Sequence, residues 1–190
     1  MPQNYRRPLS STNIAPGPES EMLPAVLGEN GAMTEMDRRH GAWMELALAE
    51  ARAALDTADV PIGAVVMGPD GAVIGTGRNE REARHDPTAH AEVVAIREAA
   101  RVLGSWRLDG CTLVVTLEPC AMCAGATVLA RIPSVVFGAW DPKAGAAGSV
   151  FDILRERRLN HWVEVYPGVR EDECGDVLRR FFEAHRGQHS

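Results

Sequence analysis

The sequence predicts a layered α/β domain, because segments with helical periodicity alternate along the chain with short apolar runs typical of buried strands. The first two apolar runs are separated only by the turn sequence Gly68-Pro69-Asp70-Gly71, which indicates a β-hairpin. The later runs are separated by helical segments, which favours parallel strands. A chain of 190 residues, of which 45% are hydrophobic, is long enough to form one domain with a substantial core.

Residues 1–37 are expected to form a disordered extension, and residues 38–190 are expected to form the folded domain. Pro, Ser, Asn and Gly interrupt the first stretch repeatedly, and no apolar period persists there. The extension contains no residue to which we assign chemistry. We therefore expect it to be dispensable for metal binding and activity.

The first half of the domain is predicted to contain two helices and two strands. Apolar residues at three- and four-residue steps predict a helix over residues 41–55, and two apolar runs predict strands over 60–67 and 72–77. A loop is expected up to Thr88. The second helix is predicted over residues 91–104, with a glycine at its end, a residue type common just past helix C-termini.

The second half continues the alternation of strands and helices. Residues 113–117 are a continuous apolar run of the kind that a sheet buried on both faces requires. Pro119 suits the first turn of the next helix, because the N–H group that proline lacks would be unpaired there. The remaining elements are predicted as a helix from Pro119 to Leu129, a strand over 135–140, a loop over 141–149, a short helix over 150–155, a strand over 161–166 and a helix over 172–185.

Charge and composition exclude several classes of protein. The net charge of −6 argues against a protein that coats nucleic acid nonspecifically. No segment resembles a membrane span or a signal peptide, so we expect a cytoplasmic protein with no membrane association. The four cysteines include one close pair, which favours metal binding in a reducing compartment over a disulfide framework. Two groups of arginines are interpreted as solvated helix faces, with an RNA footprint as the alternative: Arg155, Arg157 and Arg158, and Arg179, Arg180 and Arg186.

The candidate chemistry lies in two short motifs, His90-Ala91-Glu92 and Pro119-Cys120-Ala121-Met122-Cys123. One imidazole and two thiols form a nitrogen and sulfur ligand set that zinc prefers, and three protein ligands leave the fourth tetrahedral position open for water. Each motif follows a predicted strand and opens a predicted helix. Two helix N-termini would therefore converge and favour the thiolate form of both cysteines.

Glu92 is expected to be the proton shuttle, since it is the only carboxylate that the sequence fixes beside a ligand. It can accept the proton of the water, deliver it to a ring nitrogen and later protonate the leaving ammonia. His-x-Glu followed by Pro-Cys-x-x-Cys is the signature of zinc-dependent nucleobase deaminases, and it is far more specific than either half.

A Cys-x-x-Cys pair by itself could also be a redox pair or half of a structural zinc site. A closed structural site needs a fourth protein ligand, and the spare thiols are Cys111 and Cys174. Cys111 opens the strand that ends at Leu117, which places it roughly 20 Å from Cys120, and Cys174 lies in the last predicted helix. Both are interpreted as buried structural thiols.

The motifs resemble those of the cytidine deaminase superfamily, and the surrounding sequence is most similar to the bacterial tRNA-specific adenosine deaminases. The resemblance covers about residues 44–186. It implies a three-layer α/β/α sandwich around a five-stranded mixed sheet, a homodimer and one zinc ion per subunit. It also implies that adenosine in the anticodon loop of an arginine tRNA is converted to inosine at the wobble position, by attack of a zinc-bound hydroxide on C6 of the adenine. The stretches that carry the resemblance are residues 85–92, 115–120, 123–126, 135–139 and 145–149.

The resemblance assigns His90, Cys120 and Cys123 as the zinc ligands and Glu92 as the proton shuttle. Asn79 matches an active-site asparagine that contacts the flipped nucleoside. Without the resemblance, an asparagine directly after a strand is equally well explained as a turn residue.

Three further residues match positions near the RNA in the family. Asp141 and Lys143 match a loop that lies near the RNA, and Phe182 falls in the C-terminal helix near the anticodon loop. Ordinary turn chemistry at Asp141 and core packing at Phe182 remain alternatives. The sequence departs from the familiar pattern at Trp140 and at Glu80-Arg81, which affects the details of RNA contact rather than the chemistry.

Three functions remain open from the sequence. The leading hypothesis is a tRNA adenosine deaminase. The second is a deaminase of small molecules such as guanine or cytosine. The segment Thr116-Leu117-Glu118 and the loop over 145–149 distinguish the two, because both resemble the tRNA enzymes. The third, a non-catalytic zinc or RNA-binding module, gives no reason for a carboxylate at position 92.

Overall fold

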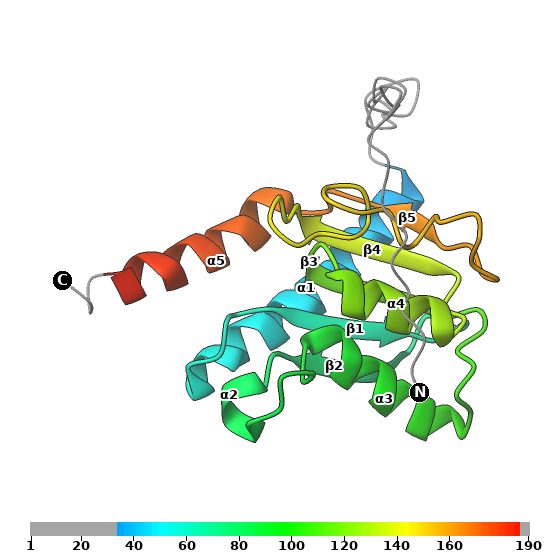
Figure 1. Ribbon diagram of the computed structural model, residues 1–190, viewed down its shortest axis with the longest axis horizontal. Helices are drawn as coiled ribbons and strands as arrows, with labels where there is room; N and C mark the ends of the chain where they lie inside the picture. Colours follow the sequence, from blue (N-terminus) through cyan, green and yellow to red (C-terminus); the bar gives the residue numbers. More distant parts are fainter. Residues whose placement is uncertain (1–33, 187–190) are drawn as a thin grey trace, which may run out of the picture. The chain divides into compact units, whose positions relative to one another are not determined.

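The computed structural model describes residues 34–186, which form a five-stranded mixed sheet between helices (Figure 1). The strand order is β2-β1-β3-β4-β5. Strand β1 is antiparallel to both of its neighbours, whereas β3, β4 and β5 are parallel. The predicted three-layer fold, with a hairpin followed by parallel strands, is confirmed. The strands are β1 (Gly63–Met67), β2 (Val73–Arg78), β3 (Thr112–Leu117), β4 (Ser134–Ala139) and β5 (Glu164–Tyr166).

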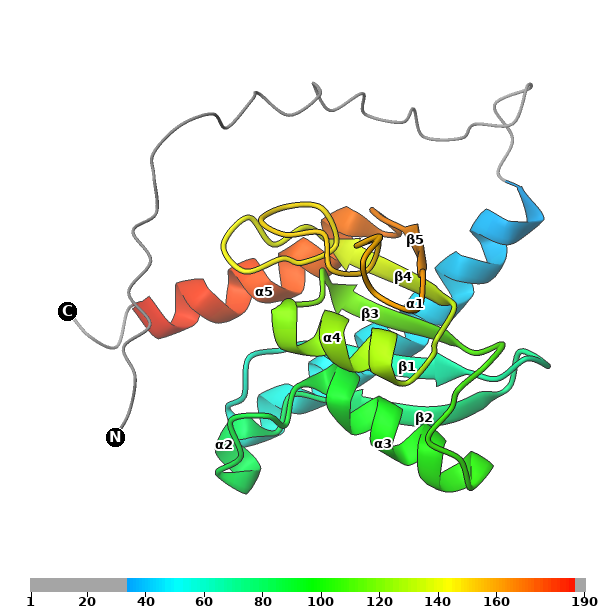
Figure 2. The same cartoon turned by 45° about the vertical axis from the view of Figure 1, so that its right-hand side comes forward.

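Helices cover both faces of the sheet (Figure 2). Helices α3 (Ala91–Leu103) and α4 (Ala121–Leu129) pack on one face, and α1 (Glu35–Ala53) and the first turns of α5 (Glu171–Arg186) pack on the other. Successive strand residues point to opposite faces, so that Val115 belongs to the core under α3 and α4, while Val114 belongs to the core under α1. Among residues 34–186, none of the helices combines the length and the apolarity that a membrane crossing requires.

Helix α1 begins earlier than the predicted start at residue 41. Thr34 is its N-cap, and the Thr34 hydroxyl accepts a hydrogen bond from the Asp37 backbone N–H, 3.1 Å away. In return the Asp37 carboxylate accepts the Thr34 N–H at 3.0 Å, which completes a reciprocal cap. Residues 34–37 therefore belong to α1 and its cap, and the remainder of the predicted extension, residues 1–33, lies outside the described residues.

Several predicted boundaries are wrong for local reasons. The predicted helix over 150–155 is absent, because the N–H groups of Val150, Phe151 and Ile153 bond backwards to carbonyls of the preceding loop instead of forming a helical ladder. Pro119 precedes α4 rather than opening it, since Cys120 is the N-cap. The predicted strand over 161–166 is reduced to β5, and the predicted loop before Thr88 contains a single helical turn, α2 (Arg81–Arg84).

Two glycines of β2 set how closely α3 approaches the sheet. A Cβ atom at Gly77 would lie 2.2 Å from the Ala91 carbonyl oxygen, and one at Gly75 would lie 2.4 Å from the Ala95 carbonyl oxygen. Because no side chain fits there, the backbone of α3 rests directly on β2. The start of α3, which carries the first motif, is thereby held at a fixed position beside the sheet.

Candidate active site

The two sequence motifs meet where α3 and α4 begin. His90 is the N-cap of α3 and Cys120 is the N-cap of α4, and neither side chain caps its own helix. The Nδ1 atom of His90 lies 3.7 Å from the Cys120 Sγ and 3.6 Å from the Cys123 Sγ. The sequence prediction that these three side chains converge at two helix N-termini is confirmed.

This group has the composition and spacing of a metal site. The ligand atoms of His90, Cys120 and Cys123 all lie within 4.8 Å of one another, a spacing that a single ion can bridge. One nitrogen and two sulfurs suit zinc in preference to magnesium or calcium, which take oxygen ligands. The group offers three protein ligands, which is the number that catalytic zinc sites use.

The pKa values of the two thiols are shifted in opposite directions. A hydrogen bond from Cys123 lowers the pKa of Cys120 to about 3, and the same hydrogen bond together with burial raises the pKa of Cys123 above its ordinary value. The hydrogen bond with Cys120 raises the pKa of His90. One thiolate is therefore already present near neutral pH, which favours capture of a soft or borderline cation.

Glu92 lies in the first turn of α3 and is only 4% exposed. Burial raises the pKa of its carboxyl to about 7, and the carboxyl is close enough to His90 and both cysteines to respond to their charges. A group that titrates near neutral pH can both take up and release a proton at low cost. Position and pKa both suit the proton shuttle that the sequence predicts.

Asn79 follows β2 and is buried, with 4% of its surface exposed. Its side-chain oxygen accepts a hydrogen bond from the Ala91 N–H at 3.2 Å, directly beside His90. The structure therefore brings Asn79 to the candidate metal group, and Asn79 does more than terminate a strand.

Glu118 is a buried carboxylate that organises the loop over residues 141–149, a role that the sequence analysis did not assign. Its oxygens accept hydrogen bonds from the N–H groups of Asp141, Ala147 and Ser149 at 2.9–3.0 Å and from the Ser149 hydroxyl. A Cβ atom at Gly145 would lie 2.2 Å from the Glu118 carboxylate, so the loop requires glycine there. The available signal was a glutamate directly after an apolar strand, because a buried carboxylate needs several donors.

The same loop is joined to the second motif through the backbone. Cys120 forms an isolated β-bridge with Gly145, and the Ala146 N–H donates to the Pro119 carbonyl at 2.8 Å. The Thr116-Leu117-Glu118 segment and the 145–149 loop, which the sequence analysis used as separate indicators, are thus parts of one hydrogen-bonded unit next to a candidate ligand.

The remaining predicted contact residues lie further out. The Asp141 carboxylate accepts the N–H groups of Lys143 and Ala144, which is turn chemistry, and Lys143 itself is exposed. Helix α5 extends beyond the sheet (Figures 1 and 2). Phe182 lies on this helix and is 49% exposed, which excludes core packing. Cys111 and Cys174 are buried, free thiols outside the candidate metal group, as predicted.

Comparison with known proteins places this site in a family. Residues 38–186 match the family model of the MafB19-like deaminases. A tRNA-specific adenosine deaminase of Bacillus subtilis (strain 168) is 50% identical over 144 residues, which are 76% of this chain and 89% of that protein.

Two solved structures are informative neighbours. One, from work on A-to-I editing by tRNA:A34 deaminases at the wobble position, is 46% identical with a TM-score of 0.69, over 72% of this chain and 99% of that one. The other, a guanine deaminase from Nitrosomonas europaea, is 26% identical with a TM-score of 0.59, over 79% of this chain and 86% of that one. The fold, the two motifs and these relatives agree, and the chain belongs to the deaminase family that contains the tRNA-specific adenosine deaminases.

Proposed function

We propose that this chain is a zinc-dependent hydrolytic deaminase that converts adenosine to inosine at the wobble position of a tRNA, with an arginine tRNA as the expected substrate. The observation that carries the chemistry is a three-ligand nitrogen and sulfur group with one buried carboxylate, Glu92, beside it. The substrate class is supported by the relative from Bacillus subtilis, which is named a tRNA-specific adenosine deaminase.

The residues take distinct roles in this proposal. His90, Cys120 and Cys123 hold the zinc ion, which when bound supplies the Lewis acid that activates water. Glu92 accepts a proton from that water, carries it to the adenine ring and then protonates the departing ammonia, so that water replaces the C6 amino group. Asn79 contacts the extruded nucleoside from its position beside Ala91.

Asp141, Lys143 and Phe182 contact the anticodon loop in this proposal. Asp141 belongs to the loop that Glu118 holds next to Cys120. Phe182 presents an exposed ring on α5, which suits stacking on an unpaired base. Loop nucleotides can be splayed into a pocket at low unpairing cost, which fits a site built for RNA.

Inosine formation on an arginine tRNA with adenine at the wobble position tests the proposal. The purified zinc protein should form inosine in this tRNA and leave free adenosine, guanine and cytosine unchanged, with Glu92→Ala as the inactive control. Turnover of guanine with inert tRNA would instead identify a small-molecule deaminase, the function of the neighbour from Nitrosomonas europaea. A Glu92→Ala protein with full activity would contradict the proton-shuttle role.

We further propose that the protein is a cytoplasmic homodimer. Four free cysteines suit a reducing compartment. Exposed apolar side chains on α4 and in the segment between β4 and β5, including Leu129 at 69% and Phe151 at 57% exposure, supply a surface that a second copy could cover. Sedimentation equilibrium should give twice the chain mass, and Leu129→Asp should shift the protein to monomer; a monomeric wild type would refute the dimer.

A further inference from the structure

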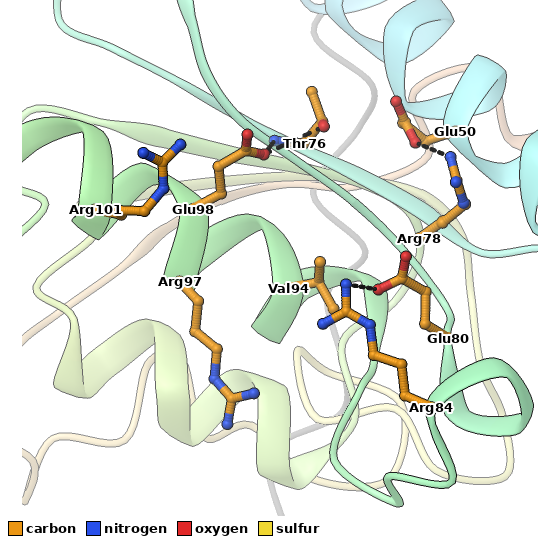
Figure 3. Close-up of a pocket in the computed structure, with 9 residues that line it drawn as sticks. All are labelled: Glu50, Thr76, Arg78, Glu80, Arg84, Val94, Arg97, Glu98 and Arg101. Carbon is orange, nitrogen blue, oxygen red and sulfur yellow. Dashed lines mark hydrogen bonds and ion pairs between the residues drawn. The ribbon is translucent and has the colours of Figure 1, made fainter.

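A second charged site lies beside the candidate active site, in a cleft of about 430 Å³ between β2, α3 and the segment that leads to His90 (Figure 3). Four arginines line it: Arg78, Arg84, Arg97 and Arg101. We call it the β2–α3 cleft. None of its arginines belongs to the candidate active site, so their convergence needs a separate explanation.

The acidic groups of the β2–α3 cleft are already engaged. Glu50 accepts a hydrogen bond from Arg78 at 3.2 Å, and Glu80 is paired with Arg84 at 2.6 Å, as Figure 3 shows. Glu98 accepts the Thr76 backbone N–H at 2.7 Å and the Thr76 hydroxyl at 3.3 Å. The two ion pairs neutralise Glu50 and Glu80 and orient two of the four guanidinium groups, whereas the Thr76 contacts leave the charge of Glu98 in place.

Arg97 and Arg101 are the cations left over. Arg101 has no ion-pair or hydrogen-bond partner for its side chain within residues 34–186, and Arg97 forms one long ion pair, with Asp86 at 4.0 Å. The two residues are four positions apart on α3, so they share one helix face. They supply the β2–α3 cleft with one unpaired and one weakly paired positive charge.

The arginine groups that stand out in the sequence are different. Arg155, Arg158 and Arg179 each bond to a carboxylate within three residues in sequence, on Asp152, Glu156 and Asp176. This supports interpreting them as solvated surface. Arg157 and Arg180, from the same two groups, are exposed and have no ion pair among residues 34–186, so unpaired positive charge is not confined to the cleft. Arg97 and Arg101 differ from them in lining a concave surface.

The position of the cleft identifies the part of an RNA that it would contact. At 1.5 Å per residue, Arg97 and Arg101 lie roughly 9 and 15 Å along α3 from Ala91, which follows His90. The opposite wall, Glu80 and Arg84, belongs to the segment that joins Asn79 to His90. The distance of Arg97 and Arg101 from the metal group is too long for contact with a base bound there. The neighbouring nucleotides of the same strand can span this distance.

We infer that the β2–α3 cleft is a docking surface for backbone phosphates of the RNA that flank the deaminated nucleoside. Guanidinium groups bind phosphate oxygens through paired, charge-assisted hydrogen bonds, and two of them on one helix face can contact successive phosphates. Such contacts add affinity without reading the base sequence. This inference rests on the proposed function.

The test compares Arg101→Ala with Arg52→Ala in the full-length zinc protein. Both residues lie in the last turn of an α-helix, so both variants lose one charge and the same interaction with the helix dipole, but Arg52 lies on α1, on the other face of the sheet. Arg52→Ala also breaks an exposed ion pair with Glu45, which the unfolding measurement takes into account. Binding of the arginine tRNA is measured by titration over a series of salt concentrations. Zinc content and thermal unfolding of each variant establish that the site and the fold are intact.

Arg101→Ala should weaken tRNA binding by about threefold to fivefold at low salt, and Arg97→Ala/Arg101→Ala by about tenfold. The slope of log affinity against log salt should fall in magnitude by about one per lost contact. KM for inosine formation should rise while kcat at saturation stays unchanged, and Arg97→Lys/Arg101→Lys should recover most of the affinity.

If the double variant bound tRNA like Arg52→Ala, with the same salt slope, the inference would be overturned. If kcat fell as much as affinity, the arginines would be acting through the active site, which also overturns it. Failure of the proposed function looks different, because the wild-type protein would then form no inosine in tRNA.

Discussion

Glu92 illustrates how burial alone changes the chemistry of a side chain. It is a carboxyl group at the start of α3, almost inaccessible to solvent, and burial raises its pKa to about 7. The two cysteines beside it are affected in the opposite sense to each other, because a hydrogen bond between them lowers one pKa and raises the other. At the residue scale, the site consists of ordinary side chains whose protonation the fold has changed.

The raised pKa of Glu92 predicts how the stability of the metal-free protein depends on pH. The folded state binds the Glu92 proton more tightly than the unfolded state does, so the contribution of this carboxyl to the free energy of unfolding falls as pH rises from about 4.5 to 7, by an amount on the order of 3 kcal/mol. The lowered pKa of Cys120 contributes in the opposite sense, so the Glu92 contribution is measured as a difference from a variant. Thermal unfolding of chelator-treated protein at pH 5 and pH 8 measures this. Glu92→Gln, which cannot ionise, should gain stability relative to the wild type between pH 5 and pH 8; a difference between the two proteins that stays constant with pH would contradict the prediction.

Serine variants should distinguish the cysteines that bind zinc from those that only pack in the core. Cys120→Ser should lower zinc affinity by more than about 100-fold, because a thiolate ligand is lost from a three-ligand group. Cys111→Ser should keep its zinc and lose only stability, since Cys111 is buried beneath the other end of β3. Zinc content by elemental analysis distinguishes the two, and a zinc-free Cys111→Ser protein that remained folded would contradict the ligand assignment.

At the element scale, the active site depends on the hydrogen bonds that hold its loops in place. Glu118 fastens the loop over 141–149, and the buried Asp59 fastens α2 by accepting the N–H groups of Glu82 and Ala83 at 2.9 and 3.3 Å. The two carboxylates come from different parts of the chain, and each holds one of the segments adjoining a motif. The loops are thus positioned by single side chains with several hydrogen bonds.

Glu118→Gln should release the loop without removing zinc. The amide NH2 group would face backbone donors, leaving buried hydrogen bonds unmade at a cost of about 1–3 kcal/mol. Hydrogen exchange at the Ala147 and Ser149 amides should accelerate, and KM for tRNA should rise. Asp59→Asn is the matched control, in which the Glu82 and Ala83 amides should respond instead; protection unchanged at Ala147 in Glu118→Gln would show that the loop is held by its other contacts.

At the scale of the whole molecule, the part of the chain that the structure describes begins at the cap of α1. Deleting residues 1–33 should leave zinc content, stability and inosine formation unchanged, because Thr34 and its reciprocal bonds with Asp37 remain. Deleting residues 1–37 removes that cap and should cost about 1 kcal/mol, visible as a lower thermal midpoint. A large loss of activity in the shorter deletion would show that the extension contributes to function.

The elements best predicted from sequence are those whose signals are local. The hairpin turn at residues 68–71, the apolar run of β3 and the glycine that ends α3 each indicate structure without knowledge of distant residues. The helix predicted over 150–155 failed because its N–H groups bond to the loop that Glu118 holds. The competing carbonyls are near in sequence, but the loop that carries them is held by Glu118, 31 residues before Ser149, and no local pattern reports that contact.

The sequence by itself determined the chemistry: a histidine, two cysteines and a glutamate at fixed spacings permit few reactions, because ligand type and number restrict the metal and its open position. Only the tertiary structure decided how that chemistry is supported. Packing buries Glu92 and raises its pKa, joins Glu118 to a loop beside Cys120, and gathers four arginines into one cleft. Burial, long-range hydrogen bonds and charge convergence depend on which distant residues meet, and this is settled when the sheet and its helices assemble.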